Sequence, residues 1–394
     1  MKFVIAADSF KGALDASPFC DAVEAGIRRR LPDAQVCKLP LADGGEGTVH
    51  AVCRALGGSV NKEKAIDPFG NSIDSYIGFC HRGKTAVIDT AAASSLATVK
   101  SYPSFSKGGI FSASTYGTGL QIRRALDHGC NKIIVGLGGS GTNDGGAGAA
   151  QALGIKYYDK DRHPVDARLG PSVLDRIAYV DTDELMPSLG KAEISLIYDV
   201  DIPLTGDSGC SVKYSKQKGA SVKDIEILEH NITSFSKACA RSIGSDLSEA
   251  AGAGAAGGLG FGLSLCGGVL RPGAEYILEL YGFDTLVKDA DAVITGEGKC
   301  DAQTADGKLP ACVARRTKMN SNAPVICLCG ISDPSPALYD VGIDAVFALC
   351  DRPMLPADSL KNTALLARKA AFNIAGLVSA LKHLLHQMTC SGEY

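Results

Sequence analysis

The chain contains no tryptophan, and aromatic residues make up only 6% of its 394 residues. This scarcity disfavours a surface on which bases or sugar rings stack against aromatic side chains. Charge is also nearly balanced, with 40 Lys and Arg against 43 Asp and Glu and a formal net charge of −3. We therefore expect neither a basic surface for nucleic acid nor an acidic interaction tail.

Long apolar runs and paired metal ligands are also missing. No run approaches the ~20 residues that a membrane span needs, and no signal-peptide pattern precedes the first strand-like segment. The 14 cysteines include no Cys-x-x-Cys spacing, and the seven histidines form no ligand pair. We interpret the cysteines as reduced core residues rather than zinc ligands or disulfides. The composition predicts a cytoplasmic protein without membrane or nucleic-acid partners, and it leaves the oligomeric state open.

Glycine, by contrast, is abundant, with 46 residues, and the segment 136–148 is especially informative. A β-branched run precedes this segment and helix-forming residues follow it. A strand, a glycine loop and a helix together present backbone N–H groups and a helix N-terminus to an anion. In this loop we assign nucleotide contacts to Gly138, Gly139, Ser140, Thr142 and Asn143. Asp144 could hold a divalent cation. A tight packing turn is the alternative, because no Lys follows the glycines as in a P-loop.

Acidic residues beside glycines follow three further strand-like segments. Asp8 to Gly12 follow the first, Asp43 to Thr48 the second, and Thr295 to Gly298 the third. Open α/β sheets bind their ligands at the carboxyl ends of strands. Carboxylates in such places suit Mg²⁺ and polyol hydroxyls better than they suit a core. Each cluster taken singly could instead be a capped turn.

Taken together, these segments resemble the type I family of bacterial glycerate kinases. The matching blocks stand in the family's order: Asp8–Gly12, Ala42–Thr48, Thr115–Gly119, Gly136–Gly148, Gln217–Ala220, Gly252–Gly260 and Thr295–Lys308. The likeness extends over nearly the whole chain, to roughly residue 380. Departures occur at Ala7, Gly141 and Ile202, where the family usually has Pro, Ala and Asn.

Strand and helix patterns alternate at both ends of the chain, which is typical of a parallel sheet covered by helices. The simplest α/β architecture is a Rossmann-like parallel-sheet domain built from both chain ends, 1–75 and 290–394. A second α/β domain, 76–289, would be inserted and would carry the glycine-rich phosphate loops. A division into N-terminal and C-terminal halves is the alternative. The turn residues 67–71 predict a hairpin.

The resemblance implies ATP- and Mg²⁺-dependent phosphorylation of D-glycerate, at the 2-hydroxyl to give 2-phosphoglycerate. A 3-phosphoglycerate-forming kinase is one alternative, and a non-catalytic nucleotide or sugar-acid sensor is another. An NAD-dependent oxidoreductase is disfavoured, because the first βα unit lacks G-x-G-x-x-G and a ribose-binding acid.

Phosphoryl transfer requires positioned phosphates, bound Mg²⁺ and cations that face the transferred group. We assign catalytic roles to Asp8, Lys11, Asp43 and Arg271. Asp8 or Asp43 could accept the hydroxyl proton. Lys11 and Arg271 could face a carboxylate or a phosphate.

Two further groups complete the expected site. Asp199 and Glu297 are the candidate metal ligands, because oxygen ligands select Mg²⁺. Gly254, within the glycine segment 252–260, would belong to a second surface of backbone donors for ATP. Close packing of a helix through small residues is the alternative for that segment.

Overall fold

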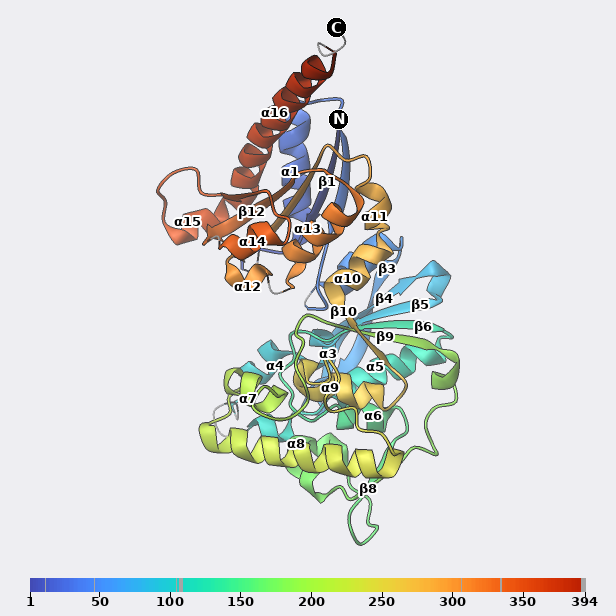
Figure 1. Ribbon diagram of the computed structural model, residues 1–394. Helices are drawn as coiled ribbons and strands as arrows, with labels where there is room; N and C mark the ends of the chain where they lie inside the picture. Colours follow the sequence, from blue (N-terminus) through green and yellow to red (C-terminus); the bar gives the residue numbers. More distant parts are fainter. Residues whose placement is uncertain are drawn as a thin grey trace. The chain divides into compact units, whose positions relative to one another are not determined.

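The computed structural model describes residues 1–10, 12–45, 47–103, 105, 109–305, 307–333 and 335–390. The chain divides into two compact units, one formed by Met1–Ala42 with Ile277–Tyr394 and the other by Asp43–Tyr276. Figure 1 shows both units in colours that follow the sequence. Each is a mixture of helices and parallel strands, so the predicted α/β class is confirmed.

The first unit contains a five-stranded sheet in which every neighbouring pair is parallel. Its strand order is β13-β12-β11-β1-β2. The strands are β1 (Lys2–Ala7), β2 (Gln35–Pro40), β11 (Ala292–Cys300), β12 (Val325–Ser332) and β13 (Ala345–Ala348). The helices are α1 (Ala16–Arg30), α11 (Phe283–Leu286), α12 (Ala302–Ala305), α13 (Leu309–Asn320), α14 (Pro336–Asp340), α15 (Pro356–Lys361) and α16 (Thr363–Cys390).

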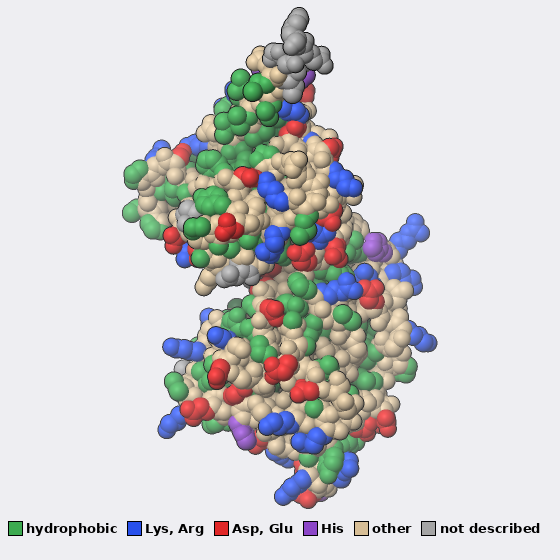
Figure 2. Space-filling view, in the orientation of Figure 1, with side chains coloured by type: hydrophobic (Ala, Val, Ile, Leu, Met, Phe, Trp, Pro, Cys, Tyr) green, Lys and Arg blue, Asp and Glu red, His purple; other side chains and the backbone are tan. Residues whose placement is uncertain are grey.

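Helix α16 packs on α1 in the core of this unit. A Cβ at Gly26 of α1 would collide with the main chain at Arg368, so glycine permits the close approach. The stretch Thr363–Met388 is long and apolar enough to cross a membrane by length and composition, although the sequence was expected to contain no such run. One side of it, including Ala371 and Ile374, belongs to the hydrophobic core. Figure 2 shows further apolar side chains exposed along its C-terminal part.

The second unit contains a six-stranded sheet in the order β10-β9-β6-β5-β4-β3. Its strands are β3 (Ser59–Ile66), β4 (Ser72–Cys80), β5 (Thr85–Asp89), β6 (Lys132–Gly136), β9 (Glu193–Tyr198) and β10 (Val269–Pro272). Strands β5, β6, β9 and β10 are parallel, whereas β3 and β4 are antiparallel additions. The turn 67–71 joins β3 to β4, which confirms the predicted hairpin.

Helices and a small hairpin complete the second unit. The longer helices are α2 (Thr48–Ala55), α5 (Tyr116–Asp127), α8 (Val222–Ile243), α9 (Ala255–Ser264) and α10 (Gly273–Leu280), the last of which crosses the boundary between units. The shorter elements are α3 (Ala91–Ser94), α4 (Leu96–Ser101), α6 (Ala147–Ala152), α7 (Cys210–Tyr214), and the strands β7 (Lys156–Tyr158) and β8 (Tyr179–Asp181). Helix α8 begins with a capping box formed by Ser221 and Asp224.

The unit boundaries differ from the predicted positions 75 and 290. Residues 43–75 belong to the second unit because β3 pairs with β4, and β4 pairs with β5. Residues 277–289 belong to the first unit, where Asp284 forms an ion pair with Arg316 of α13 at 2.7 Å. Strand pairing and this ion pair join residues that are distant in sequence, so local pattern did not reveal them.

Every cysteine whose side chain the structure describes is a free thiol, and all of these but Cys37 and Cys350 are buried. Small buried thiols behave as core hydrophobes. The prediction that the cysteines are core residues is confirmed for the buried members of this described set and is wrong for the exposed Cys350.

Candidate active site

The parallel strands of the second sheet bring the ends of several sequence blocks into one row. Gly136 of β6 lies opposite Asp89 of β5 on one side and Ile197 of β9 on the other. Arg271 of β10 is in register with the same Ile197. Asp199 follows β9 directly. The glycine loop, Asp199 and Arg271 therefore share the carboxyl edge of this sheet, where α/β sheets bind ligands.

The segment that contains Asp43 lies against this edge, which sequence spacing alone did not require. A Cβ at Gly138 would collide with Gly45, and a Cβ at Gly44 would lie 2.5 Å from the carbonyl oxygen of Ile197. A Cβ at Gly273, after β10, would collide with the carbonyl of Asp43. Glycines on both partners thus allow residues 43–45 to reach the ends of β6, β9 and β10.

The charged groups at this edge are only partly covered. Asp43 is half-buried, and its Oδ1 accepts a hydrogen bond from the Gly45 N–H at 3.3 Å. Asp199 is exposed, and its negative charge adds to burial in raising the pKa of Tyr214. The Arg271 guanidinium lies 5.4 Å from the centroid of the Tyr276 ring. Three charged side chains of the second unit are therefore at least partly exposed to solvent at this edge: Asp43, Asp199 and Arg271.

The glycine loop itself is more deeply packed than the sequence suggested. Ser140, Thr142 and Asn143 are all buried. The Asn143 amide donates to the Ser211 hydroxyl at 3.0 Å, and the Ser140 hydroxyl lies 3.3 Å from that of Thr142. Within 136–148 the exposed residue is Gly139, which has a φ of 70°. In this conformation a ligand can approach the loop backbone from solvent at Gly139.

Asp144 occupies the position where an external anion was expected. Its carboxylate accepts from the N–H groups of Thr115 at 2.8 Å, Gly146 at 3.0 Å and Gly148 at 3.3 Å. Gly146 is the N-cap of α6 and Gly148 is its second residue, so Asp144 is the anion at the N-terminus of that helix. The side chain is fully buried, and burial raises its pKa. These internal donors occupy the carboxylate oxygens, which disfavours the hypothesis that Asp144 holds a cation.

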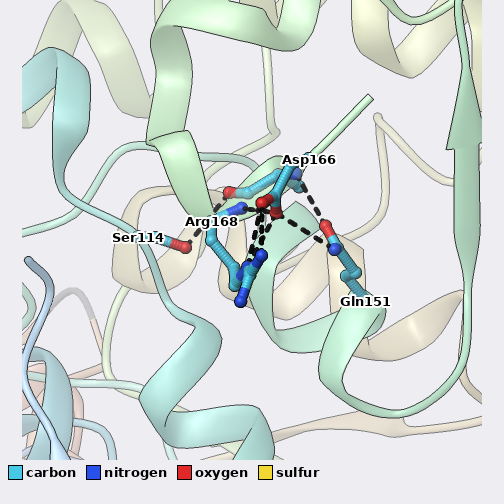
Figure 3. Close-up of polar contacts among 5 residues, drawn as sticks. Ser114, Gln151, Asp166 and Arg168 are labelled. Carbon is cyan, nitrogen blue, oxygen red and sulfur yellow. Dashed lines mark hydrogen bonds and ion pairs between the residues drawn. The ribbon is translucent and has the colours of Figure 1, made fainter. Parts of the chain in front are cut away.

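Figure 3 shows a group of polar contacts in which Ser114, Gln151, Asp166 and Arg168 take part. The single hydroxyl proton of Ser114 is shared between the Asp144 carboxylate at 3.3 Å and the Ala167 carbonyl at 3.2 Å. Next to Ala167, Asp166 accepts from Arg168 at 2.7 Å and from the Gln151 amide at 3.1 Å. These contacts link the segment after α6 to the residues that hold Asp144.

The glycine segment 252–260 also packs internally. The Gly254 N–H donates to the Ile202 carbonyl at 3.0 Å, so this donor is already engaged. A Cβ at Gly257 would collide with the Thr142 carbonyl, and one at Gly258 would lie 2.6 Å from Gly145. Here the geometry favours the packing alternative over a surface of backbone donors for ATP.

The first unit presents a separate carboxyl edge. Strands β1 and β11 are parallel neighbours, with Ile5 opposite Ile294, and the Asp8 N–H donates to the Gly296 carbonyl at 3.1 Å. Asp8 and Glu297 therefore lie at the same edge of the sheet. Lys11 lies outside the described residues.

Glu297 is the most perturbed carboxyl group at this edge. Burial raises its pKa to about 7, although the Thr304 hydroxyl donates to it at 2.5 Å and the positive charge of Lys308 opposes the shift. Asp301 forms an ion pair with Lys299 at 2.8 Å. A half-buried carboxylate with one hydroxyl donor is a group that a cation would stabilise in its charged form.

Sequence reasoning missed two residues around the glycine loop. Thr115 holds Asp144 through its N–H and hydroxyl, and the buried Lys218 donates to the Thr142 carbonyl at 2.7 Å. Both residues lie in sequence blocks flanked by glycines, and this is the sequence feature that could have identified them. Away from these edges, Asp159, Asp161 and His163 lie close together on a turn, but Asp159 already accepts two backbone N–H groups there.

The fold and these edges define a two-unit α/β protein with carboxylates and glycine turns suited to a small polar ligand. Residues 3–379 match the pattern of the Glycerate kinase family. Curated relatives named glycerate kinase include one from Bacillus subtilis, 38% identical over 97% of this chain and 99% of its own. Another, from Haemophilus influenzae, is 40% identical over 97% of this chain and 100% of its own.

A protein from Escherichia coli named glycerate 2-kinase is 39% identical over 89% of this chain and 90% of its own. The crystal structure of a putative glycerate kinase 2 from Salmonella typhimurium superposes with a TM-score of 0.84. It shares 39% identity over 97% of this chain and 99% of that one. The chain belongs to the glycerate kinase family, which is a family of phosphotransferases.

Proposed function

We propose that the protein transfers the γ-phosphoryl group of ATP to D-glycerate, at the 2-hydroxyl, in a reaction that depends on Mg²⁺. The supporting observation is full-length similarity to glycerate kinases, including the Escherichia coli protein named for the 2-position. The 3-hydroxyl is the alternative acceptor. D-Glycerate and ATP are the small-molecule partners of this proposal, and the cytoplasm is the proposed location.

The second unit supplies one group of reacting residues in this proposal. Arg271 would face the glycerate carboxylate or a phosphate, since guanidinium matches both geometries. Asp43 would lie beside it, because its carbonyl packs on the turn that follows Arg271. The exposed backbone at Gly139 would meet a phosphate oxygen. The buried side chains of Ser140, Thr142 and Asn143 would support the loop from within rather than touch the nucleotide.

The first unit supplies Asp8 and, in this proposal, Lys11. Asp8 or Asp43 would accept the proton of the attacking hydroxyl. The hydroxyl oxygen forms the new bond to phosphorus, the bond between that phosphorus and the ADP oxygen breaks, and the proton passes to the carboxylate. A charged Lys11 would stabilise the negative oxygens of the transferred group.

Asp199 of the second unit and Glu297 of the first are each suited to a divalent cation. Asp199 is an exposed carboxylate directly after β9, and Glu297 is a half-buried carboxylate with a raised pKa. Mg²⁺ selects such oxygen ligands, and when bound it neutralises phosphate charge.

The test combines an activity assay with a matched pair of variants. Purified protein is mixed with ATP, Mg²⁺ and D-glycerate, ADP is followed, and phosphorus NMR distinguishes the two phosphoglycerates. Asp199→Asn should lower kcat/KM by about 10–100-fold. Asp201→Asn, an exposed acid two residues further on, should leave it unchanged.

No ADP release would refute the kinase. Turnover of NAD with hydroxy acids would point to an oxidoreductase, and ATP binding without turnover would point to a sensor. Equal activity of Asp199→Asn and the parent would remove Asp199 from the metal site.

A further inference from the structure

Lys218 is a buried cation inside the second unit. It ends a short 3-10 turn, Lys216–Lys218, and only 3% of its surface is exposed. Lys216, two residues earlier, is exposed. Removing an ammonium group from water is costly unless the protein gives it partners. We therefore expect the buried Lys218 ammonium to have specific partners in the protein.

The ammonium is directed at the glycine loop. Its Nζ donates to the Thr142 carbonyl oxygen at 2.7 Å. The charged and titratable groups that act on it are the Asp144 carboxylate and the Cys210 thiol, both buried. Burial lowers the pKa of Lys218 to about 8, while Cys210 and Asp144 oppose this shift. At neutral pH the group is therefore mostly charged.

The segment that carries Lys218 contacts the loop at a second residue. Ser211 of α7 accepts a hydrogen bond from the Asn143 amide at 3.0 Å. Near these contacts the Asn143 Oδ1 and the Ser215 hydroxyl are buried without a partner among the described residues. Two adjacent loop residues, Thr142 and Asn143, are thus held by residues 211–218.

The contacts from residues 211–218 hold the loop close to its solvent-exposed residue. Gly139 is exposed three residues before Thr142, and its carbonyl accepts from the Leu96 N–H at 2.9 Å. The Gly141 N–H donates to the Ser94 carbonyl at 2.8 Å. The loop is therefore anchored at its exposed residue and just after it, and the anchor at Thr142 is the charged one.

We propose that Lys218 is a positioning residue that holds the glycine loop in the conformation in which Gly139 meets the ATP phosphates. The inference rests on the proposed function. Lys218 acts through the Thr142 carbonyl and does not touch the substrates. A neutral side chain at position 218 releases the loop. It therefore weakens ATP binding more than it changes the KM for glycerate.

The experiment compares Lys218→Met with the matched control Lys216→Met. Calorimetry measures ATP affinity, steady-state kinetics separate KM for glycerate from kcat, and hydrogen exchange follows the peptide 138–148 without ligand. Lys218→Met should weaken ATP binding about 10- to 100-fold, because a charge-assisted bond is lost. Its KM for glycerate should stay within about twofold of the parent. Amide exchange in the loop should be faster, and Lys216→Met should match the parent throughout.

A pH series tests the same idea in the unmodified protein. As pH rises from 7 through 8 to 9.5, the ammonium loses its proton and donates a weaker bond. The parent should then lose about three- to tenfold in ATP affinity. Lys218→Arg should show no such loss, because guanidinium keeps its charge in this range. If Lys218→Met does not fold, the parent profile decides the question.

Two results would overturn the proposal: a folded Lys218→Met that binds ATP like the parent, or a parent affinity that is constant from pH 7 to 9.5. If the parent binds no ATP at any pH, the proposed function fails instead. The hydrogen-exchange comparison then still shows whether Lys218 holds the loop.

Discussion

Replacement of Asp144 by Ala should destabilise the second unit whether or not Mg²⁺ is present. The change leaves the backbone N–H groups of Thr115, Gly146 and Gly148 without their acceptor in a buried site. An unsatisfied buried donor costs about 1–3 kcal/mol. The change also removes the cost of burying the Asp144 charge, which offsets part of that loss. We expect a net loss of roughly 2–4 kcal/mol, which corresponds to about 4–16 °C in melting temperature for a unit of this size.

The matched control for this prediction is Asp183→Ala. Asp183 is exposed on the same unit, so its removal should change stability by less than about 0.5 kcal/mol. Asp144→Asn keeps one acceptor oxygen and should fall between the two variants. Differential scanning calorimetry with and without Mg²⁺ measures all three proteins. A shift below about 2 °C for Asp144→Ala would contradict the internal capping role. So would a shift that is clearly larger with Mg²⁺ than without it.

Four further outcomes are expected. Chelation by EDTA should abolish turnover and added Mg²⁺ should restore it, so full activity in chelator would refute the kinase mechanism. Gly139→Val and Gly139→Asn should both lose ATP binding, whereas only Val should also lose about 1–2 kcal/mol of stability, because Asn tolerates a φ of 70°. Normal ATP affinity in a folded Gly139→Asn would make the loop a packing turn. Lys11→Met should lower kcat/KM for glycerate about 10–150-fold with ATP affinity retained, and a prior loss of ATP binding would place this segment on the nucleotide. Relative to Lys218→Met, the free energy of unfolding of the parent, measured in urea, should increase by up to about 3 kcal/mol between pH 8 and 10.5. A decrease of this difference over the same pH range would contradict burial of the charge. The folded state, with a pKa of about 8 against the ordinary 10.5, releases that proton first.

Local sequence was sufficient for the features that depend on near neighbours. The β-branched run before Gly136 predicts β6, and the residues 67–71 predict the turn between β3 and β4. Because parallel strands end at a common edge, the acids and glycines that follow them were expected to face a ligand. The register of β6, β9 and β10 places Gly136 and Arg271 in one row, in keeping with that expectation. The order of the glycine blocks was enough to identify the family.

Contacts between distant segments decided what the sequence could not. Residues 43–75 join the second unit through antiparallel pairing, and the partner of a strand is set by the whole sheet. The same polar residues in a glycine loop can point outward or inward, depending on which glycines adopt positive φ and what packs behind them. Here the α9 glycines press against the loop, so Asn143 turns inward and Asp144 takes the helix N-terminus. Local sequence therefore determined that glycine loops and acids follow the strands. Only tertiary packing decided that Gly139 remains exposed while its polar neighbours are buried and hold the loop.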